Sequence, residues 1–426
     1  MTVPLSQFTR GLKTETAFDV LAVAQQLKAG GKDVVQLQIG DSPFASTAEA
    51  KRAGIRAIQT DQTHYCPSVG LSAFRQVIAE HVNRQHNLSL TEANIVVGPG
   101  AKVFEQFFCE AVVNPGDQVL IFSPHFPTYV PNIERRGGQV VFSQLRADHA
   151  FRPSMDDVRQ FVQQPRARAI FLNSPHNPTG GVAEEQDIEE LVRIIRGKPI
   201  GLFSDEPYDQ MVWRGRHHSP IAHDILDQCV AAYTFSKSFS MSGWRVGYAV
   251  SSPRLATAIA TMINTALSCV PPIVQCAALE ALKHDEAESQ ANMKRFANKV
   301  RLLSDALRRV EGVQVVEPAG TFYVFPQVAQ ICNRLKIRSH GLAMYLLEAA
   351  DDAFGVACLG GECFGAAGSG FLRFSCAEPD DRLLEAIEFL PDAFSRQDRI
   401  DRYLKAHSEY RLPSPYPVVA APAPTV

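Results

Sequence analysis

The sequence shows no excess of basic residues, no regular cysteine pattern and no pattern typical of a signal peptide. Lysine and arginine number 42 against 45 aspartate and glutamate residues, a net charge of −3. This balance offers no basic surface for nucleic acid or for an anionic membrane. Nine cysteines, an odd number, are scattered from Cys66 to Cys376 without a C-x-x-C pair or a Cys/His cluster, which argues against a disulfide framework and a metal site. We therefore expect a small-molecule ligand and a reducing, cytoplasmic setting.

No segment has the pattern of a membrane span. The N-terminal stretch MTVPLSQFTRGLKTETAF lacks the apolar core of a signal peptide. The most apolar window, residues 262–282, is interrupted by Pro271 and Pro272, so we interpret it as a buried loop and helix rather than a membrane span. Residues 413–426 are rich in proline and alanine and are predicted to be unstructured.

The order of apolar and amphipathic segments predicts an α/β fold. From about residue 90 to 250, short apolar runs alternate with helical patterns such as Ile188, Leu191, Val192 and Ile195, which indicates a mainly parallel sheet covered on both faces. Only about ten residues separate the run ending at Phe235 from the run beginning at Val246, too few for a parallel crossover, so one strand is predicted to be antiparallel.

The rest of the chain predicts a smaller α+β domain. A long helical region near 284–310 and a looser order of helices and strands follow the alternating region. We predict an N-terminal segment, residues 1–50, that joins the small domain. A large domain over 51–285, a small domain over 286–398 and a partly disordered tail over 399–426 follow.

Candidate functional residues follow the predicted strands. GPGAKVF (98–104) is a glycine turn that opens a helix and could hold a phosphate, although such a turn is also common without a ligand. SPHFPTY contains Phe126 and Tyr129, which core packing would also explain. NSPHNPTG (173–180) contains Asn177 before a proline, a candidate for a cis bond or a plain turn. SDEPYDQ places Asp205 at a strand end, where a helix cap is the alternative, with Tyr208 three residues on.

The stretch TFSKSFSMSGWR (234–245) is the most informative. A lysine at a strand end within a sheet pays a desolvation cost unless it is neutral or bonded. Thr234 and Ser236 supply hydroxyl groups, and Arg245 supplies a cationic fork suited to a phosphate. Lys237, these phosphate ligands and Asp205 one strand earlier are the groups that a pyridoxal phosphate enzyme needs.

Seven motifs in order, Tyr65-x4-Gly70, GPGAKVF, SPHFPTY, NSPHNPTG, SDEPYDQ, TFSKSFSMSGWRVGY and GSGFLRFSC, resemble those of the class I/II pyridoxal-phosphate-dependent aminotransferases. That family belongs to fold type I, the aspartate aminotransferase superfamily, and the resemblance covers roughly residues 20–395. It implies a mainly parallel seven-stranded sheet between helices and a smaller α+β domain. Lys237 would form the Schiff base and then move the substrate α-proton, and Asp205 would keep the pyridine nitrogen protonated. Tyr208 and Asn177 would bond the phenolic oxygen, and Phe126 would stack on the ring.

The same resemblance implies the ligands of the phosphate and of the substrate. The backbone of Ala101 and Lys102, the side chains of Thr234, Ser236 and Arg245, and Tyr65 of a second subunit would hold the phosphate, which implies a homodimer. Arg373 in FLRFS would bind the substrate α-carboxylate. Gly40 would add a backbone contact and Asn177 would also face the substrate, while Phe322 and Tyr323 would border it. The local sequence DSPF after Gly40 departs from the commoner E-P-D-F pattern of the family.

The predicted function is transfer of an amino group between an L-amino acid and a 2-oxo acid by a ping-pong mechanism. A C–S β-lyase, or another carbanion-route enzyme of this fold, needs the same residues and stays an alternative. A cofactor-binding transcriptional regulator is disfavoured, because we find no DNA-binding module. A dicarboxylate substrate would need a second cation, for which Arg10, Lys13 or a residue of the partner subunit are candidates. Asp41 would instead repel a distal carboxylate or accept a basic side chain.

Overall fold

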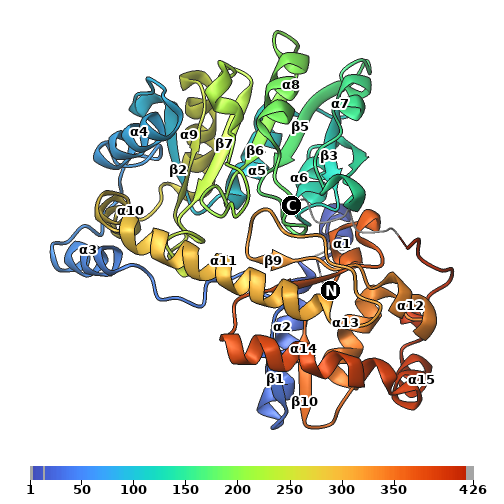
Figure 1. Cartoon of the computed structure of the whole chain (residues 1–426). Coiled ribbons are helices and arrows are strands. Elements are labelled where there is room, and N and C mark those ends of the chain that lie inside the picture. The colour runs from blue at the N-terminus through green and yellow to red at the C-terminus, as the bar shows by residue number, and fades with distance from the viewer. Residues whose placement is uncertain (1–2, 13–14, 419–426) are drawn as a thin grey trace.

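A seven-stranded sheet forms the centre of the larger part of the molecule. The computed structural model describes residues 3–12 and 15–418. The strands, in the spatial order β2-β8-β7-β6-β5-β3-β4, are β2 Ile95–Gly98, β8 Gly247–Val250, β7 Cys229–Thr234, β6 Gly201–Asp205, β5 Ala167–Asn173, β3 Gln118–Ser123 and β4 Gln139–Gln144 (Figure 1). β8 is antiparallel to both of its neighbours, and the other pairs are parallel. The predicted fold class, including the antiparallel strand after Phe235, is confirmed.

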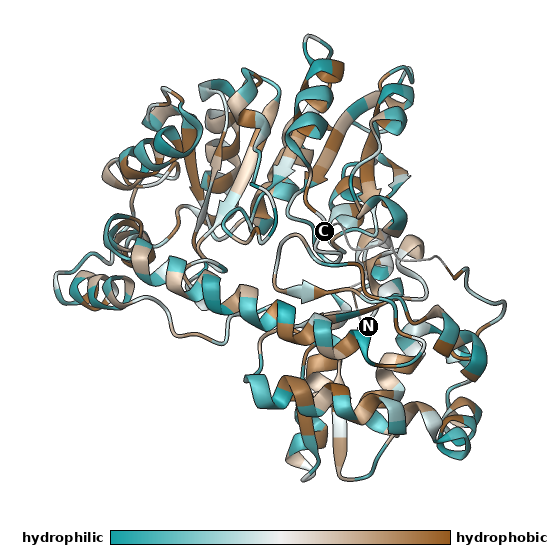
Figure 2. Ribbon diagram, viewed as in Figure 1, coloured by the Kyte–Doolittle hydropathy of each residue, from teal (hydrophilic) through white to brown (hydrophobic). Residues whose placement is uncertain are grey.

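The strands are apolar on both faces because helices cover both sides of the sheet. Successive residues of one strand join two different clusters of buried side chains: Phe171 and Phe203 pack with α5 (Lys102–Val112) and α9 (Pro253–Leu267), whereas Ile170 and Leu202 face α8 (Glu185–Ile195). Figure 2 shows the brown strands between helices whose outer faces are teal. This period of two fixes which strand-end side chains point in the same direction.

The other helices of this part are α3 (Ala48–Gln59), α4 (Ser72–His86), α6 (Tyr129–Arg135), α7 (Met155–Phe161) and α10 (Pro272–His284). The apolar window at 262–282 forms the end of α9, a loop and α10. The predicted burial is wrong for part of it, because residues 264–268 are exposed where α9 ends on the surface. Across the described residues, none of the helices combines the length and the apolar character that a membrane span requires.

The second part combines the N-terminal segment with residues that follow the long helix α11 (Glu286–Arg308), which runs along the boundary between the two parts (Figure 1). β1 (Asp33–Gln36) pairs in parallel with β10 (Phe354–Ala357). β12 (Leu372–Ser375) lies between β11 (Leu359–Gly360) and β9 (Tyr323–Val324) in an antiparallel sheet. The helices are α1 (Gln7–Gly11), α2 (Thr16–Ala29), α12 (Ala329–Leu335), α13 (Ser339–Glu348), α14 (Asp380–Ser395) and α15 (Gln397–Ala406).

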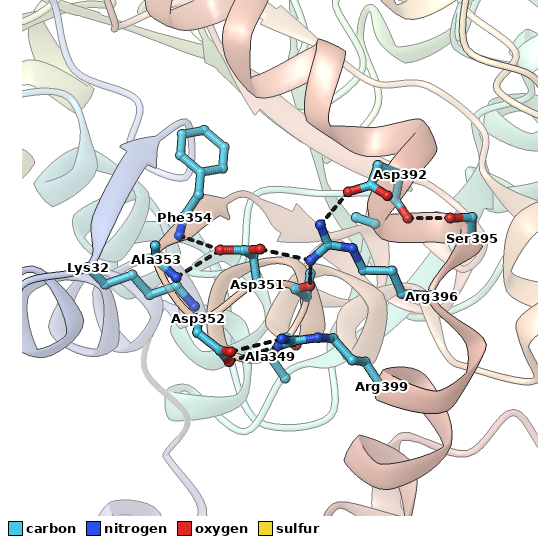
Figure 3. A network of polar contacts seen from close by, with 12 residues as sticks. Lys32, Ala349, Asp351, Asp352, Ala353, Phe354, Asp392, Ser395, Arg396 and Arg399 are labelled. Atoms are coloured by element: carbon cyan, nitrogen blue, oxygen red, sulfur yellow. Dashed lines mark hydrogen bonds and ion pairs between the residues drawn. The ribbon is translucent and has the colours of Figure 1, made fainter.

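A network of arginines ties the C-terminal helices to the turn before β10 (Figure 3). Arg396, at the junction of α14 and α15, donates to the Asp351 carboxylate at 2.8 Å, and Arg399 binds Asp352 through two bonds of 2.8 Å. The Arg396 guanidinium lowers the pKa of Asp351 to about 2. Asp351 also accepts the backbone N–H groups of Ala353 and Phe354, at 2.8 and 3.0 Å, so the turn that begins β10 is fixed from both sides.

The chain beyond α15 stays on the protein surface. Residues 413–418 form no helix or strand, but the backbone N–H of Tyr416 donates to Asn333 at 2.7 Å and its hydroxyl donates to Glu362 at 2.5 Å. The rest of the predicted unstructured stretch, residues 419–426, lies outside the described residues.

Candidate active site

A cavity of about 560 Å³ opens where the carboxyl ends of β5, β6 and β7 face the second part of the chain. This is where ligands bind in open α/β sheets. The predicted site residues that line it are Gly40, Ala101, Lys102, Phe126, Asn177, Asp205, Tyr208, Thr234, Ser236, Lys237, Arg245 and Arg373. Tyr65 does not line the cavity, and it is 88% exposed. The structure therefore brings twelve of the predicted residues, from segments far apart in the chain, to one cavity.

Lys237 lies in the loop between β7 and β8 and projects its amine into the cavity. The Nζ atom donates to the backbone carbonyl of Gly40 at 2.5 Å, and it lies 5.6 Å from the ring centre of Phe322. A Cβ atom at Gly40 would come within 1.8 Å of the Tyr323 hydroxyl. A larger residue at this position would therefore require the Tyr323 side chain to move.

Asp205 ends β6 and is buried beneath the cavity. The Tyr129 hydroxyl donates a hydrogen bond to its carboxylate, and Asn173 Nδ2 donates to its backbone carbonyl at 2.9 Å. Burial raises the pKa of Asp205 to about 7, against the opposing effect of the Tyr129 hydrogen bond. A cationic group placed against this carboxylate would favour its charged form.

A cradle of donors faces the opposite end of the cavity. The Thr234 and Ser236 hydroxyls lie 2.8 Å apart, and Arg245 donates to the carbonyls of Pro99 and Ser242 at 2.9 and 2.8 Å. A Cβ atom at Gly100, whose φ is +86°, would lie 2.6 Å from an Arg245 nitrogen. Ala101 and Lys102, at the start of α5, also line the cavity, and none of the described side chains caps this helix. The N-terminus of a helix offers free backbone N–H groups to a phosphate. The donor set is that of an anion site.

Arg373 on β12 closes the cavity from the second part of the molecule. It donates to Asn177 Oδ1 at 3.0 Å and to the Gln38 carbonyl at 2.6 Å. Its Nε atom is buried and has no acceptor among the described residues. The Tyr208 and Tyr323 hydroxyls, 3.1 Å apart, lie beside it, and burial raises the pKa of Tyr208. An orphaned guanidinium donor of this kind suits a carboxylate that arrives with the substrate.

These features match the requirements of pyridoxal phosphate. A buried carboxylate suits a pyridinium nitrogen, Phe126 offers an aromatic face, a lysine amine suits an aldehyde, and the donor cradle suits a phosphate. The fold and the cavity define a fold type I pyridoxal phosphate enzyme. Residues 32–390 match the aminotransferase class I and II family, and the chain belongs to that family.

Named aminotransferases are similar to this chain over nearly its full length. The sequence is 34% identical over 387 residues to a probable aspartate/prephenate aminotransferase of Aquifex aeolicus, a match that covers 90% of this chain and 96% of the relative. It is 32% identical to the aspartate/prephenate aminotransferase of Thermus thermophilus, over 90% and 97% of the two chains. The solved structure of Thermus thermophilus aspartate aminotransferase with maleate has a TM-score of 0.85 and 29% identity, over 92% of this chain and all of that one. The protein is thus a pyridoxal-phosphate-dependent aminotransferase.

The structure also adds site residues that received no role from the sequence. Tyr129 holds Asp205. Glu105 is buried, accepts the Thr128 hydroxyl and Asn132 Nδ2, and has its pKa raised by burial. The sequence could have indicated this residue, because Glu105 places a carboxylate among the apolar residues Phe104, Phe107 and Phe108 of one helix.

Of the cations considered for a dicarboxylate substrate, Arg10 does not line the cavity and Lys13 lies outside the described residues, whereas Asp41 does line it. Lys102 lines the cavity, and its side-chain amine forms an ion pair with Glu15. Within residues 3–12 and 15–418, no group of three or more His, Cys, Asp or Glu side chains is arranged to hold a metal ion.

Proposed function

We propose that this enzyme exchanges the α-amino group of an L-amino acid with the keto oxygen of a 2-oxo acid by a ping-pong reaction, with Lys237, Asp205 and Arg373 as its central residues. The observation that carries this proposal is their convergence on one cavity from three distant segments. Relatives bear names such as aspartate/prephenate aminotransferase and asparagine–oxo-acid transaminase, which fit this substrate class.

When bound, the cofactor supplies an aldehyde that can bond to an amine and a ring that takes up electrons. Lys237 Nζ would hold the cofactor covalently and, once released, would take the proton from the substrate Cα. The Gly40 carbonyl, which accepts from Nζ at 2.5 Å, would orient that amine. Asp205 would stay ionised against the ring nitrogen, while Tyr208 and Asn177 would donate to the phenolic oxygen.

Arg373 would fix the substrate by its α-carboxylate. Its Nη1 atom bonds Asn177, and its buried Nε atom has no acceptor among the described residues. Two parallel N–H donors on a carboxylate orient the substrate as well as bind it. The Cα–H bond can then be held toward Lys237.

The phosphate would be held by the backbone of Ala101 and Lys102, by Thr234 and Ser236, and by Arg245. We further propose a homodimer in which Tyr65 of the partner subunit reaches this phosphate. The 88% exposure of Tyr65 in the single chain is consistent with a role across an interface. A cytoplasmic location stays a prediction of the cysteine pattern.

The test begins with purified protein loaded with pyridoxal phosphate. Borohydride reduction followed by peptide mapping is expected to label Lys237, and label on another lysine would refute the assignment. Product analysis with an amino acid and a 2-oxo acid is expected to yield the exchanged pair. Pyruvate and ammonia instead would indicate the elimination activity of a C–S lyase.

A further inference from the structure

The walls of the active-site cavity carry balanced charges. Among the residues that the structure describes, four cationic side chains line it, those of Lys102, Lys237, Arg245 and Arg373, together with four anionic ones, those of Glu15, Asp41, Glu105 and Asp205. The proposed function engages Lys237, Arg245 and Arg373 with the cofactor and the α-carboxylate. Lys102 is the remaining described cation that could meet a substrate side chain.

Lys102 is already paired with carboxylates of the chain itself. Glu15, directly before α2, forms an ion pair with Lys102 Nζ, although the two residues lie 87 positions apart. The Glu15 side chain is only 15% exposed. The buried carboxylate of Glu105 is also close enough to raise the pKa of Lys102, against the larger lowering by burial.

A second carboxylate on the substrate would meet an unfavourable environment. To bind Lys102 it would have to displace Glu15, and it would then lie near Glu15, Glu105 and Asp41. Like charges in a partly desolvated cavity disfavour one another. The same cavity offers apolar surface from Phe18, Ile39, Leu359 and Phe364, which favours an uncharged side chain.

We propose that Glu15 is a specificity-determining residue: by neutralising Lys102 it makes the enzyme select amino acids and 2-oxo acids with uncharged side chains over those with acidic ones. This inference rests on the proposed function and adds the substrate class. Several relatives have names that contain aspartate, and those names describe the relatives and not this chain. The inference for this chain rests on the contact between its own Glu15 and Lys102.

The experiment compares the cofactor-loaded wild type with Glu15→Gln, which keeps the size and removes the charge. Each enzyme is mixed with L-leucine, L-phenylalanine, L-aspartate or L-glutamate alone, and the change in cofactor absorbance gives kcat/KM for that half-reaction. The wild type is expected to favour leucine and phenylalanine. In Glu15→Gln the ratio of aspartate to leucine is expected to rise about tenfold or more, the worth of one charge-assisted hydrogen bond.

A second measurement does not depend on turnover. Titration of the loaded enzyme with succinate, a dicarboxylate without an amino group, is expected to show about tenfold tighter binding to Glu15→Gln than to wild type. The double variant Glu15→Gln/Lys102→Met is expected to lose this gain. Asp19→Asn is the control for a general charge effect. It also removes one negative charge, but Asp19 lies in α2 and does not line the cavity.

A preference of the wild type for aspartate over leucine would overturn the inference, and so would equal succinate affinities in wild type and Glu15→Gln. Failure of every amino acid to change the absorbance would instead reject the proposed function. The succinate titration would still decide the role of Glu15 in that case.

Discussion

The Tyr129 hydroxyl donates a hydrogen bond to the Asp205 carboxylate, which joins the start of α6 to the end of β6 across 76 residues. This bond lowers the pKa of Asp205 and opposes the effect of burial. The ionised form that a ring nitrogen requires therefore depends on a residue outside the sequence motif of Asp205.

Tyr129→Phe is expected to weaken binding of pyridoxal phosphate about tenfold, as loss of a hydrogen bond to a charged group implies. Because the pKa of Asp205 rises further, the pH below which cofactor affinity falls should move upward. Absorbance titrations between pH 6 and 9 measure both effects. Tyr345→Phe, which loses a hydroxyl bonded to the Ala393 carbonyl away from the cavity, is the control. An unchanged pH profile in Tyr129→Phe would contradict the role of this bond.

Gly40→Ala is expected to lower kcat about a hundredfold without unfolding the protein, because a Cβ atom would displace Tyr323 and shift the carbonyl that orients Lys237. Steady-state kinetics and circular dichroism test this together. Gly243→Ala is a matched control, because Gly243 also lines the cavity but a Cβ there meets nothing within 4 Å. Equal losses in the two variants would show that the steric argument is wrong.

Arg373→Lys keeps the charge but removes the planar fork. We expect kcat/KM to fall about a hundredfold through a higher KM, with little change in cofactor affinity. The same change at Arg382, which pairs with Asp33 on the surface, should leave kinetics unaltered. A selective loss of cofactor binding in Arg373→Lys would show that this arginine binds the cofactor instead of the substrate.

The buried pair of Glu206 and His217 predicts a pH-dependent stability. Burial alone would lower the pKa of His217, but the Glu206 carboxylate, 2.7 Å away, raises it overall. Burial alone would raise the pKa of Glu206, but His217, Ser204 and Ser219 lower it. The histidine contribution is complete below its ordinary pKa of 6.5 and is lost as pH rises through the raised value. The glutamate contribution is complete above 4.5 and is lost as pH falls through the lowered value.

His217→Gln should therefore destabilise the protein by about 3–5 kcal/mol near pH 6, because Glu206 stays buried without its partner. The difference from wild type should shrink on the alkaline side. Urea unfolding at pH 6 and pH 9 checks this, with the exposed His149→Gln as the control. A difference that does not change with pH would contradict the ion pair.

The sequence predicted those parts of the fold and site that depend on short stretches. The antiparallel β8 followed from the length of one connection. Asp205, Lys237 and Arg245 could be proposed as site residues because each lies in a local motif beside a strand. The pairs Tyr129–Asp205 and Glu15–Lys102 could not be predicted, because a contact between distant side chains depends on how the helices pack on the sheet. The assignments of individual residues to cofactor and substrate stay predictions until they are tested.

The bond from Tyr416 to Glu362 places Tyr416 behind a wall of the cavity. Glu362 also accepts the backbone N–H groups of Ser339 and His340, and the next two residues, Cys363 and Phe364, line the cavity. Proteolytic trimming before Tyr416 would therefore remove a support of that wall. Such processing would act on the cavity wall from outside, while the predicted catalytic residues remained intact.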